Sequence, residues 1–473
     1  MRKLTYLSLL LPFLAGALEF SKVFQSNMVL QQNMPIPICG KAAPGEKITL
    51  SFDGKKLSGT ADQKGHWRVL LPKVKASKEN RSMILQGRKE KIVLKNILVG
   101  EVWFCSGQSN MHWKLAQSLN GKETAVQSNY PLIRTLSVDA VNSSSLQESF
   151  KGSWKSIKPE NAGKLSGVGF YFARHLHQKL DIPVGLVCVT RGGTMIEPWL
   201  PCGAADKYPQ IARQWRRIYK KVPGQKKPRL QDQPQNQPYV IYNGAVHAVR
   251  HLTCRGVIWY QGCSNIWFDT EEEYFLKQQA LWDGWKKAFK NPDLKFYAVQ
   301  IAPLLRPEKY YQGHLNVWLA QQRFADNNKN VHLVITNDVG DLKNIHPVNK
   351  EPVGRRLADL ALKHEYGCNI PADFPRLSKK EIKGNKFILH FAHVSSWKTT
   401  DGKEIRNFEL AGRDGKFHPA QVKIRGSLLE VSAPGVEKAA ALRYMYHPGK
   451  MGNLVNGHDL PPGTFAIAPG EAR

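Results

Sequence analysis

A serine stands on a short polar turn directly after a strongly apolar run of residues. Residues 102–105 form the run, and Ser106-Gly107-Gln108-Ser109-Asn110-Met111 follows it. A tight turn after a strand exposes the serine hydroxyl and lets the serine N–H face a developing oxyanion. Ser109 is therefore a candidate nucleophile. By itself such a serine is more often a plain turn residue, so other segments have to support it.

Three further apolar runs end in polar or glycine-rich segments. These runs are residues 186–190, 257–260 and 331–336. Gly192 and Gly193 follow the first run, Asn265 follows the second, and His346 follows the third. Glycines let a backbone N–H approach a ligand, asparagine offers an amide donor, and histidine serves as a general base. Each signal alone is weak, but together with Ser109 they form a catalytic constellation.

These segments need a scaffold that brings several strand ends to one edge. Between residues 96 and 373, short apolar runs alternate with longer stretches whose apolar residues recur at helical spacing, as Val168, Phe172 and Leu176 do. That alternation predicts an α/β domain with a parallel sheet covered by helices. In such a sheet the ligand crevice lies beyond the carboxyl ends of the strands. In residues 18–95 and 374–473, apolar residues recur at every second position in short segments separated by turn signals. This pattern predicts two small flanking β-sandwich-like domains.

The chain is strongly basic. Its 68 Lys and Arg residues outnumber 38 acidic residues, which gives a formal net charge of +30 over 473 residues. This surplus favours an anionic partner by long-range attraction. No zinc-finger spacing or aromatic RNA-binding pattern accompanies the charge, which argues against nucleic acid as the partner. The seven cysteines form no close CxxC pair, so a structural metal site is not expected.

The N-terminal residues have the pattern of an export signal. Arg2 and Lys3 precede an apolar run over residues 4–14, and Ala15-Gly16-Ala17 supplies small residues for cleavage. The run is shorter than the roughly 20 apolar residues that span a bilayer. We therefore expect a signal peptide over residues 1–17 and no stable membrane insertion after its removal. The mature protein is expected to be periplasmic or secreted.

Further motifs accompany these blocks along nearly the whole mature chain. They include Phe24-Gln25-Ser26-Asn27-Met28-Val29-Leu30-Gln31 near the start, Gly107-Gln108-Ser109-Asn110-Met111, Gly192-Gly193-Thr194, Trp259-Tyr260-Gln261-Gly262, Ile345-His346-Pro347 with Lys350, and Arg443-Tyr444 and Leu460-Pro461-Pro462 in the last domain. Met111 stands where the Gly-x-Ser-x-Gly elbow has glycine, which argues against the α/β-hydrolase fold. The set resembles the sialate O-acetylesterase-like carbohydrate esterases of the SGNH hydrolase superfamily. The resemblance implies a flavodoxin-like parallel sheet.

The resemblance also implies roles for the candidate residues. Ser109 would attack an acetyl ester carbonyl, with His346 as general base and then as general acid. The oxyanion would be held by the N–H groups of Ser109 and of Gly192 or Gly193, and by the Asn265 side chain. The implied substrate is an O-acetylated sugar, as for a sialic acid 9-O-acetylesterase, and no metal or organic cofactor is implied. The alternatives are an acetylxylan or other polysaccharide esterase and a noncatalytic glycan-binding relative.

Two positions depart from the pattern of the resembled family. Many SGNH enzymes carry aspartate three residues before the histidine, where this chain has Lys343. Asp341 is then the first candidate for the acid that orients His346, with Asp338 second; a Ser-His dyad is the third possibility. The other departure is Cys263, where the family block has glutamate. A thiol does not carry the charge of a carboxylate at neutral pH.

Overall fold

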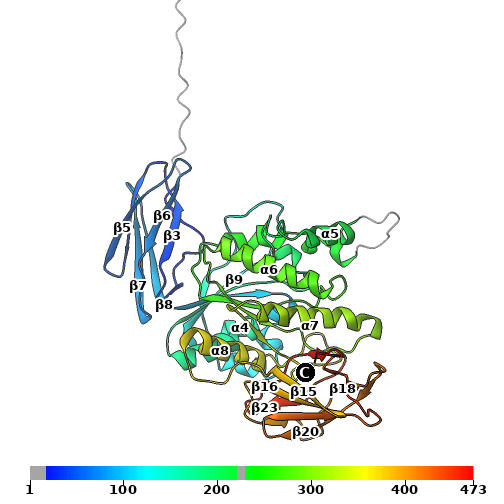
Figure 1. Ribbon diagram of the computed structural model, residues 1–473. Coiled ribbons are helices and arrows are strands. Elements are labelled where there is room, and N and C mark those ends of the chain that lie inside the picture. Colours follow the sequence, from blue (N-terminus) through cyan, green and yellow to red (C-terminus); the bar gives the residue numbers. More distant parts are fainter. Residues whose placement is uncertain (1–16, 221–228, 472–473) are drawn as a thin grey trace, which may run out of the picture.

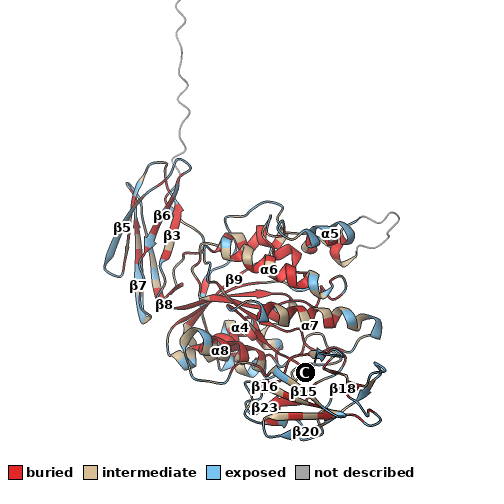
Figure 2. Ribbon diagram, in the orientation of Figure 1, coloured by how far each residue is buried: buried red, intermediate tan, exposed pale blue. Residues whose placement is uncertain are grey.

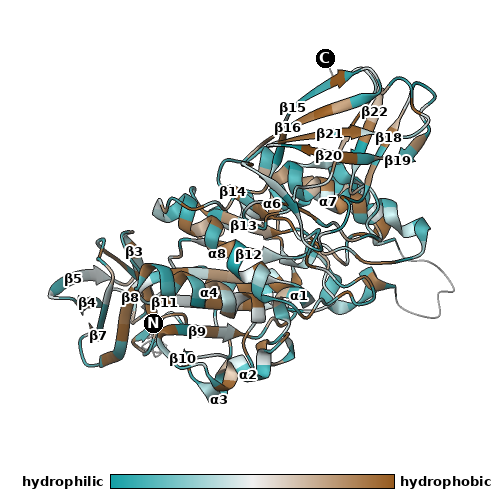
Figure 3. Cartoon of the chain, turned by 90° about the horizontal axis from the view of Figure 1, so that it is seen from below, coloured by the Kyte–Doolittle hydropathy of each residue, from teal (hydrophilic) through white to brown (hydrophobic). Residues whose placement is uncertain are grey.

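Three parts follow one another along the chain in the computed structural model, which describes residues 17–220 and 229–471 (Figure 1). A β-rich N-terminal part is followed by a central domain of strands and helices and by a β-rich C-terminal part. The two β-rich parts lie at opposite ends of the central domain (Figures 1 and 3). All of the expected signal peptide except Ala17 lies outside the described residues.

Two small sheets form the N-terminal part. The strands of the first are β1 (Glu19–Phe20), β3 (Ile36–Lys41) and β6 (His66–Leu71). The strands of the second are β2 (Val29–Gln31), β4 (Lys47–Phe52), β5 (Lys55–Thr60), β7 (Ser77–Gln86) and β8 (Lys91–Gly107). Burial alternates along β6, as expected for a strand with one face on a core. The predicted boundary after residue 95 falls inside β8, which continues into the central sheet.

The central sheet has the strand order β10-β9-β11-β8-β12-β13-β14. Its further strands are β9 (Tyr130–Val138), β10 (Trp154–Ile157), β11 (Val184–Thr190), β12 (Gly256–Tyr260), β13 (Lys295–Val299) and β14 (Val331–Val334). All these strands pair in parallel except β10. Gly107 at the end of β8 pairs with Thr190 of β11 and with Tyr260 of β12. The segments after these three strands therefore begin at one edge of the sheet.

Helices cover both faces of this sheet, as the alternation of apolar runs predicted. The covering helices are α4 (Gly167–Leu180) and α8 (Glu351–Tyr366) on one face and α6 (Glu271–Ala288) and α7 (Tyr311–Asp326) on the other. Side chains of β8 alternate between the two cores: Trp103 and Cys105 join the first, and Phe104 joins the second. Buried residues fill the sheet and the helix sides that face it (Figure 2). The short helices are α1 (Ser109–His112), α2 (Gly121–Val126), α3 (Pro159–Ala162) and α5 (Pro209–Ile218).

Antiparallel sheets form the C-terminal part. One contains β15 (Arg376–Lys383), β16 (Lys386–Ala392), β20 (Gln421–Arg425) and β21 (Leu428–Ser432). Another contains β18 (Phe408–Ala411), β19 (Phe417–Pro419), β22 (Ala441–Tyr444) and β24 (Phe465–Ile467), and β17 (Trp397–Thr399) pairs with β23 (Leu454–Asn456). The Asn337 amide donates to the Pro462 carbonyl at 2.9 Å, which ties this part to the segment after β14. Among the helices of the described ranges, none is both long and apolar enough to cross a membrane.

Candidate active site

Ser109 is the first residue of α1 and follows β8 after a sharp change of direction. Gly107 has a φ of +138°, and a Cβ there would lie 2.3 Å from the Tyr260 carbonyl oxygen, so the turn requires glycine. The Ser109 side chain is half-buried and forms no hydrogen bond with another described residue. The hydroxyl is therefore free to donate its proton to a general base and to contact a substrate.

The loop after β11 runs directly beside this serine. A Cβ on Gly192 would lie 3.5 Å from the Cβ of Ser109, and the Arg191 N–H donates to the Gly107 carbonyl at 3.1 Å. Gly193 has a φ of +70°, a left-handed conformation that favours glycine. The structure thus brings Gly192 of the predicted glycine pair next to the predicted nucleophile, which makes its backbone N–H a candidate oxyanion donor.

His346 reaches the serine turn from the loop after β14. The Asn110 amide donates to the Ile345 carbonyl at 2.9 Å, and the His346 ring stacks on Trp113 with 4.9 Å between centroids. Burial lowers the pKa of His346, and the positive charge of Lys350 lowers it further. The imidazole is therefore neutral at neutral pH, which is the form that a general base needs.

Neither candidate aspartate contacts the His346 ring. Asp341 is exposed, and its carboxylate accepts the N–H of Lys343 at 2.9 Å within its own turn. Asp338 forms two hydrogen bonds with the Arg356 guanidinium, at 2.8 and 2.6 Å. Within the described ranges, no carboxylate is hydrogen-bonded or ion-paired to the His346 ring. The structure therefore holds the histidine loop against the serine turn but brings neither predicted acid to the His346 ring.

Asn265 has a different environment from the one expected of an oxyanion donor. Its side chain is fully buried, and the amide donates to Asp269 at 2.9 Å and to Glu197 at 3.3 Å. Its oxygen accepts the N–H of Ile196 at 3.0 Å. The contacts with Glu197 and Ile196 hold the loop after β11 against the loop after β12. Because two carboxylates already engage the amide, no free amide hydrogen is left for an oxyanion.

A polar link between the serine turn and the histidine loop was not identified from the sequence. Lys350, the residue before α8, is only 2% exposed, and its ammonium donates to the Asn110 side-chain oxygen. It pairs with no carboxylate of the described residues. Burial lowers the pKa of Lys350 to about 7. The available signal was a lysine four residues after His346, directly before the predicted helix.

A hollow beside the serine offers room for a substrate. Its volume is about 280 Å³, and its lining includes His112, Thr190, Arg191 and Gly192. A larger hollow of about 540 Å³ lies between the N-terminal part and the central domain, but neither Ser109 nor His346 lines it. Ser109 and His346 do not line the smaller hollow either, but Gly192, which lies against Ser109, does, so this hollow lies next to the candidate active site.

Residues 99–363, more than half of the chain, match the family described as carbohydrate esterase, sialic acid-specific acetylesterase. The chain belongs to this family. This chain is therefore a carboxylic ester hydrolase. The alternative of a protein that only binds glycans is set aside.

Similar proteins extend the match beyond the central domain. Sialate O-acetylesterase of Homo sapiens is 27% identical over 429 residues, covering 83% of this esterase and 80% of the human protein. That of Mus musculus is 25% identical over 458 residues, covering 85% and 84%. The crystal structure of a carbohydrate acetylesterase from Xanthomonas citri covers 95% of this chain and 99% of its own, with a TM-score of 0.84 at 28% identity. The flanking β parts thus belong to the architecture of this relative as well.

Replacing Lys350 with methionine is expected to move the acidic limb of the esterase's kcat/KM profile to higher pH. His346 has to be neutral to act as a base, so activity falls as the pH drops through its pKa. Lys350 is charged below about pH 7 and so depresses the pKa of His346 across that limb. Without the charge, this pKa rises toward the ordinary value of about 6.5. Lys350→Arg retains the charge as a control; an unchanged limb in Lys350→Met would show that burial alone sets the pKa.

A buried ionic cluster supports the loops that carry the site. Lys277 of α6 donates to Glu197 and, at 2.7 Å, to Asp269, and none of these three side chains is exposed. Burial would lower the pKa of Lys277, but Asp269 and Glu197 together raise it. For Asp269 burial dominates and raises the pKa to about 6. Asn265 joins both carboxylates, so the cluster fastens the loops after β11 and β12 to α6.

Replacing Lys277 with methionine is expected to lower the free energy of unfolding by about 3 to 5 kcal/mol, because two buried carboxylates lose their cation. Urea unfolding followed by circular dichroism measures the change. Lys287→Met on the same helix is the control, because Lys287 is exposed and its loss is expected to cost less than about 1 kcal/mol. Equal midpoints for both variants would contradict a stabilising role of the cluster.

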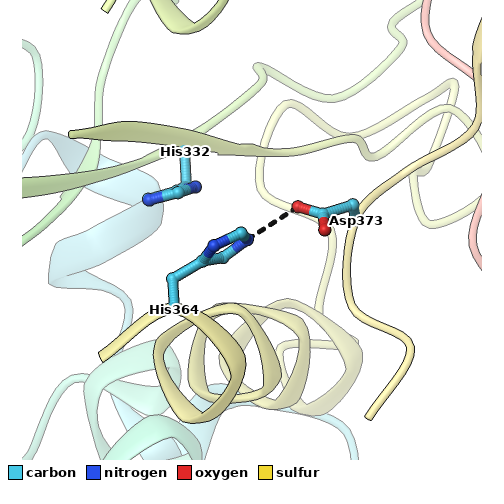
Figure 4. A group of neighbouring side chains, drawn as sticks. All are labelled: His332, His364 and Asp373. Atoms are coloured by element: carbon cyan, nitrogen blue, oxygen red, sulfur yellow. Dashed lines mark hydrogen bonds and ion pairs between the residues drawn. The ribbon is translucent and has the colours of Figure 1, made fainter. Parts of the chain in front are cut away.

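In the part of the chain that the structure describes, one group of side chains has metal-binding residue types in close proximity. The potential ligand atoms of His332, His364 and Asp373 lie within 4.8 Å of one another (Figure 4). However, His364 and Lys363 engage the Asp373 carboxylate at 2.8 and 2.6 Å. The two imidazole rings stack with 4.0 Å between centroids, and parallel rings do not converge their in-plane lone pairs on one ion. We interpret the group as an ion pair and ring stack that join α8 to the start of the C-terminal part.

Proposed function

We propose that this esterase removes O-acetyl groups from sugars, with O-acetylated sialic acid as its substrate, through an acetyl-enzyme on Ser109. One observation carries the proposal: a serine with a free hydroxyl lies against Gly192 and is linked through Asn110 to the loop that bears a neutral histidine. The +30 net charge supports a substrate with a carboxylate over a neutral one.

In the proposed reaction, His346 removes the Ser109 proton as the hydroxyl oxygen attacks the acetyl carbonyl. The N–H groups of Ser109 and of Gly192 or Gly193 stabilise the resulting oxyanion, and each such donor is worth about 2.7 to 4 kcal/mol. His346 then returns the proton to the sugar oxygen, and the deacetylated sugar leaves. Water, deprotonated by His346, hydrolyses the acetyl-enzyme and releases acetate.

The sheet supports assignment of the central domain to the SGNH hydrolase superfamily. Without the edge strands β9 and β10, the strand order β11-β8-β12-β13-β14 corresponds to 2-1-3-4-5 in chain order. This is the flavodoxin-like order, in which ligands bind where the strand order reverses, between the first and third strands. Ser109 follows β8, the first of these strands, at that position.

Acetylated polysaccharide is the second candidate substrate. The observation in its favour is the similarity over 95% of the chain to the Xanthomonas citri protein, which is described as a carbohydrate acetylesterase without reference to sialic acid. Both candidates use the same bond chemistry, so substrate choice depends on the residues around the serine.

Acetate release from purified protein tests the function directly. The panel contains 9-O-acetylated N-acetylneuraminic acid, acetylated xylan and acetylated xyloglucan, each at several concentrations. We expect the largest kcat/KM on the acetylated sialic acid. Turnover of the polysaccharides alone would show that the substrate is a neutral glycan and not a sialic acid. A complete absence of acetate release from all of these esters would contradict the esterase mechanism.

We also propose that the protein is exported and that its first 17 residues are removed. The basic, apolar and small-residue pattern of this segment supports the proposal. N-terminal sequencing of the protein recovered from the periplasm or culture medium is expected to begin at Leu18. Recovery of an intact N-terminus from the cytosol would contradict it.

A further inference from the structure

Cys263 lies near two cations, Arg306 and Lys350, neither of which is ion-paired with a carboxylate of the described residues. Its Sγ is 3.9 Å from the amide nitrogen of Asn110, the residue next to Ser109. Burial raises the pKa of the Cys263 thiol to about 11, against the opposing effects of the nearby Arg306 and Lys350 charges. The thiol is therefore neutral, and it compensates neither cation. Glutamate, which the resembled family has here, would have carried a negative charge near both cations.

Arg306 is the more accessible of the two cations. It lies on the loop after β13, and among the described residues no carboxylate forms an ion pair with it. Its Nε atom is buried without a hydrogen-bond partner in that same part of the chain, a state that is rare and needs a reason. The guanidinium lies over the ring of Trp267, 4.9 Å from its centroid.

Trp267 gives this cation an aromatic surface. Its side chain is 41% exposed, which is unusual for tryptophan, and Tyr310 packs edge-on against it with 4.7 Å between centroids. Trp267 stands two residues after Asn265, on the loop that follows β12 at the carboxyl edge of the sheet. Ligand sites combine such an apolar surface with a few polar groups that fix the orientation of the ligand. Trp267 and Arg306 supply one group of each kind.

Among the described residues, no carboxylate is paired with Arg306, and the neighbouring histidine carries no charge. His314 of α7 is 3% exposed, and burial keeps its pKa near 3, with a further lowering by Arg306, so it remains neutral. The buried Lys350 adds positive potential near Cys263. In a site of low dielectric, such uncompensated charge attracts an anion far more strongly than it would in water.

We propose that Arg306 and Trp267, with Lys350 behind them, form a subsite that binds the carboxylate and ring of an acidic sugar next to Ser109. The inference rests on the proposed function and deepens it, because it names the residues that would select an acidic sugar over a neutral one. A bidentate pair between guanidinium and carboxylate gives both affinity and orientation.

Competitive inhibition of aryl acetate hydrolysis tests the subsite. The probes are N-acetylneuraminic acid and its carboxamide, which differ in charge but not in shape and carry no ester. We expect the acid to inhibit the wild-type enzyme at a concentration about 10-fold lower or more than the amide. Arg306→Gln and Cys263→Glu are expected to abolish this preference, the first by removing the cation and the second by supplying an internal carboxylate. Cys263→Ser is the matched control and is expected to retain it.

The outcomes separate the two proposals. Equal inhibition by acid and amide in the wild-type enzyme would overturn the subsite, even if acetylated sialic acid is turned over. Retention of the preference in Arg306→Gln would overturn it as well. Preference for the acid without turnover of acetylated sialic acid would instead reject the proposed substrate and keep the subsite. Calorimetric titration with the same two ligands gives the same comparison if aryl acetate proves a poor substrate.

Discussion

Replacing Ser109 with alanine is expected to reduce kcat/KM for acetate release by about 10,000-fold or more, equivalent to about 5.4 kcal/mol of transition-state stabilisation. The variant keeps the turn, because the backbone of residues 107–109 and the contact with Gly192 do not involve the hydroxyl. Only the atom that forms the acetyl-enzyme is lost. A coupled acetate assay with the wild-type substrate measures the change.

Ser106→Ala provides the matched control for this result. Ser106 lies three residues earlier and is fully buried, and its hydroxyl donates to the Val189 carbonyl at 2.8 Å. We expect it to cost about 1 to 3 kcal/mol of stability and to leave a far larger activity than Ser109→Ala. Wild-type turnover by Ser109→Ala would remove Ser109 as the nucleophile.

Replacing His346 with glutamine is expected to lower kcat by about 1,000-fold to 10,000-fold with a small effect on KM. The base acts in the transition states of both half-reactions, whereas nothing in the structure assigns the ring to ground-state binding of the sugar. The acidic limb of the pH profile, which follows the lowered pKa of His346, should disappear in this variant. Steady-state kinetics between pH 5 and 9 would reveal both effects.

Asp341→Asn decides whether a third residue takes part. In the structure the Asp341 carboxylate accepts from Lys343 in its own turn, and asparagine retains that acceptor. We therefore expect less than about a threefold loss. Loss of the acid from a working Ser-His-Asp triad costs about 10,000-fold, so a loss of that size would show that the loop rearranges to bring Asp341 to His346.

The strand and helix pattern could be predicted from the sequence because it is encoded locally. The apolar runs at 102–105, 186–190 and 257–260 all lie within observed strands, and the helical repeat of Val168, Phe172 and Leu176 lies within α4. The mixed α/β class was correct for the same reason. The continuous β8, which crosses from the N-terminal part into the central sheet, was not anticipated, because a strand's pairing on each side depends on distant partners.

The sequence by itself determined the family, the candidate nucleophile and its glycine and histidine companions, because these depend on short motifs after apolar runs. Tertiary structure alone decided which polar atoms meet. In the structure the Asn265 amide donates to two buried carboxylates, and the Asp341 carboxylate accepts a hydrogen bond within its own turn. Asn110 accepts a hydrogen bond from Lys350, 240 positions away. Hydrogen bonds depend on the direction and distance of side chains from different loops, and no spacing along the chain specifies either.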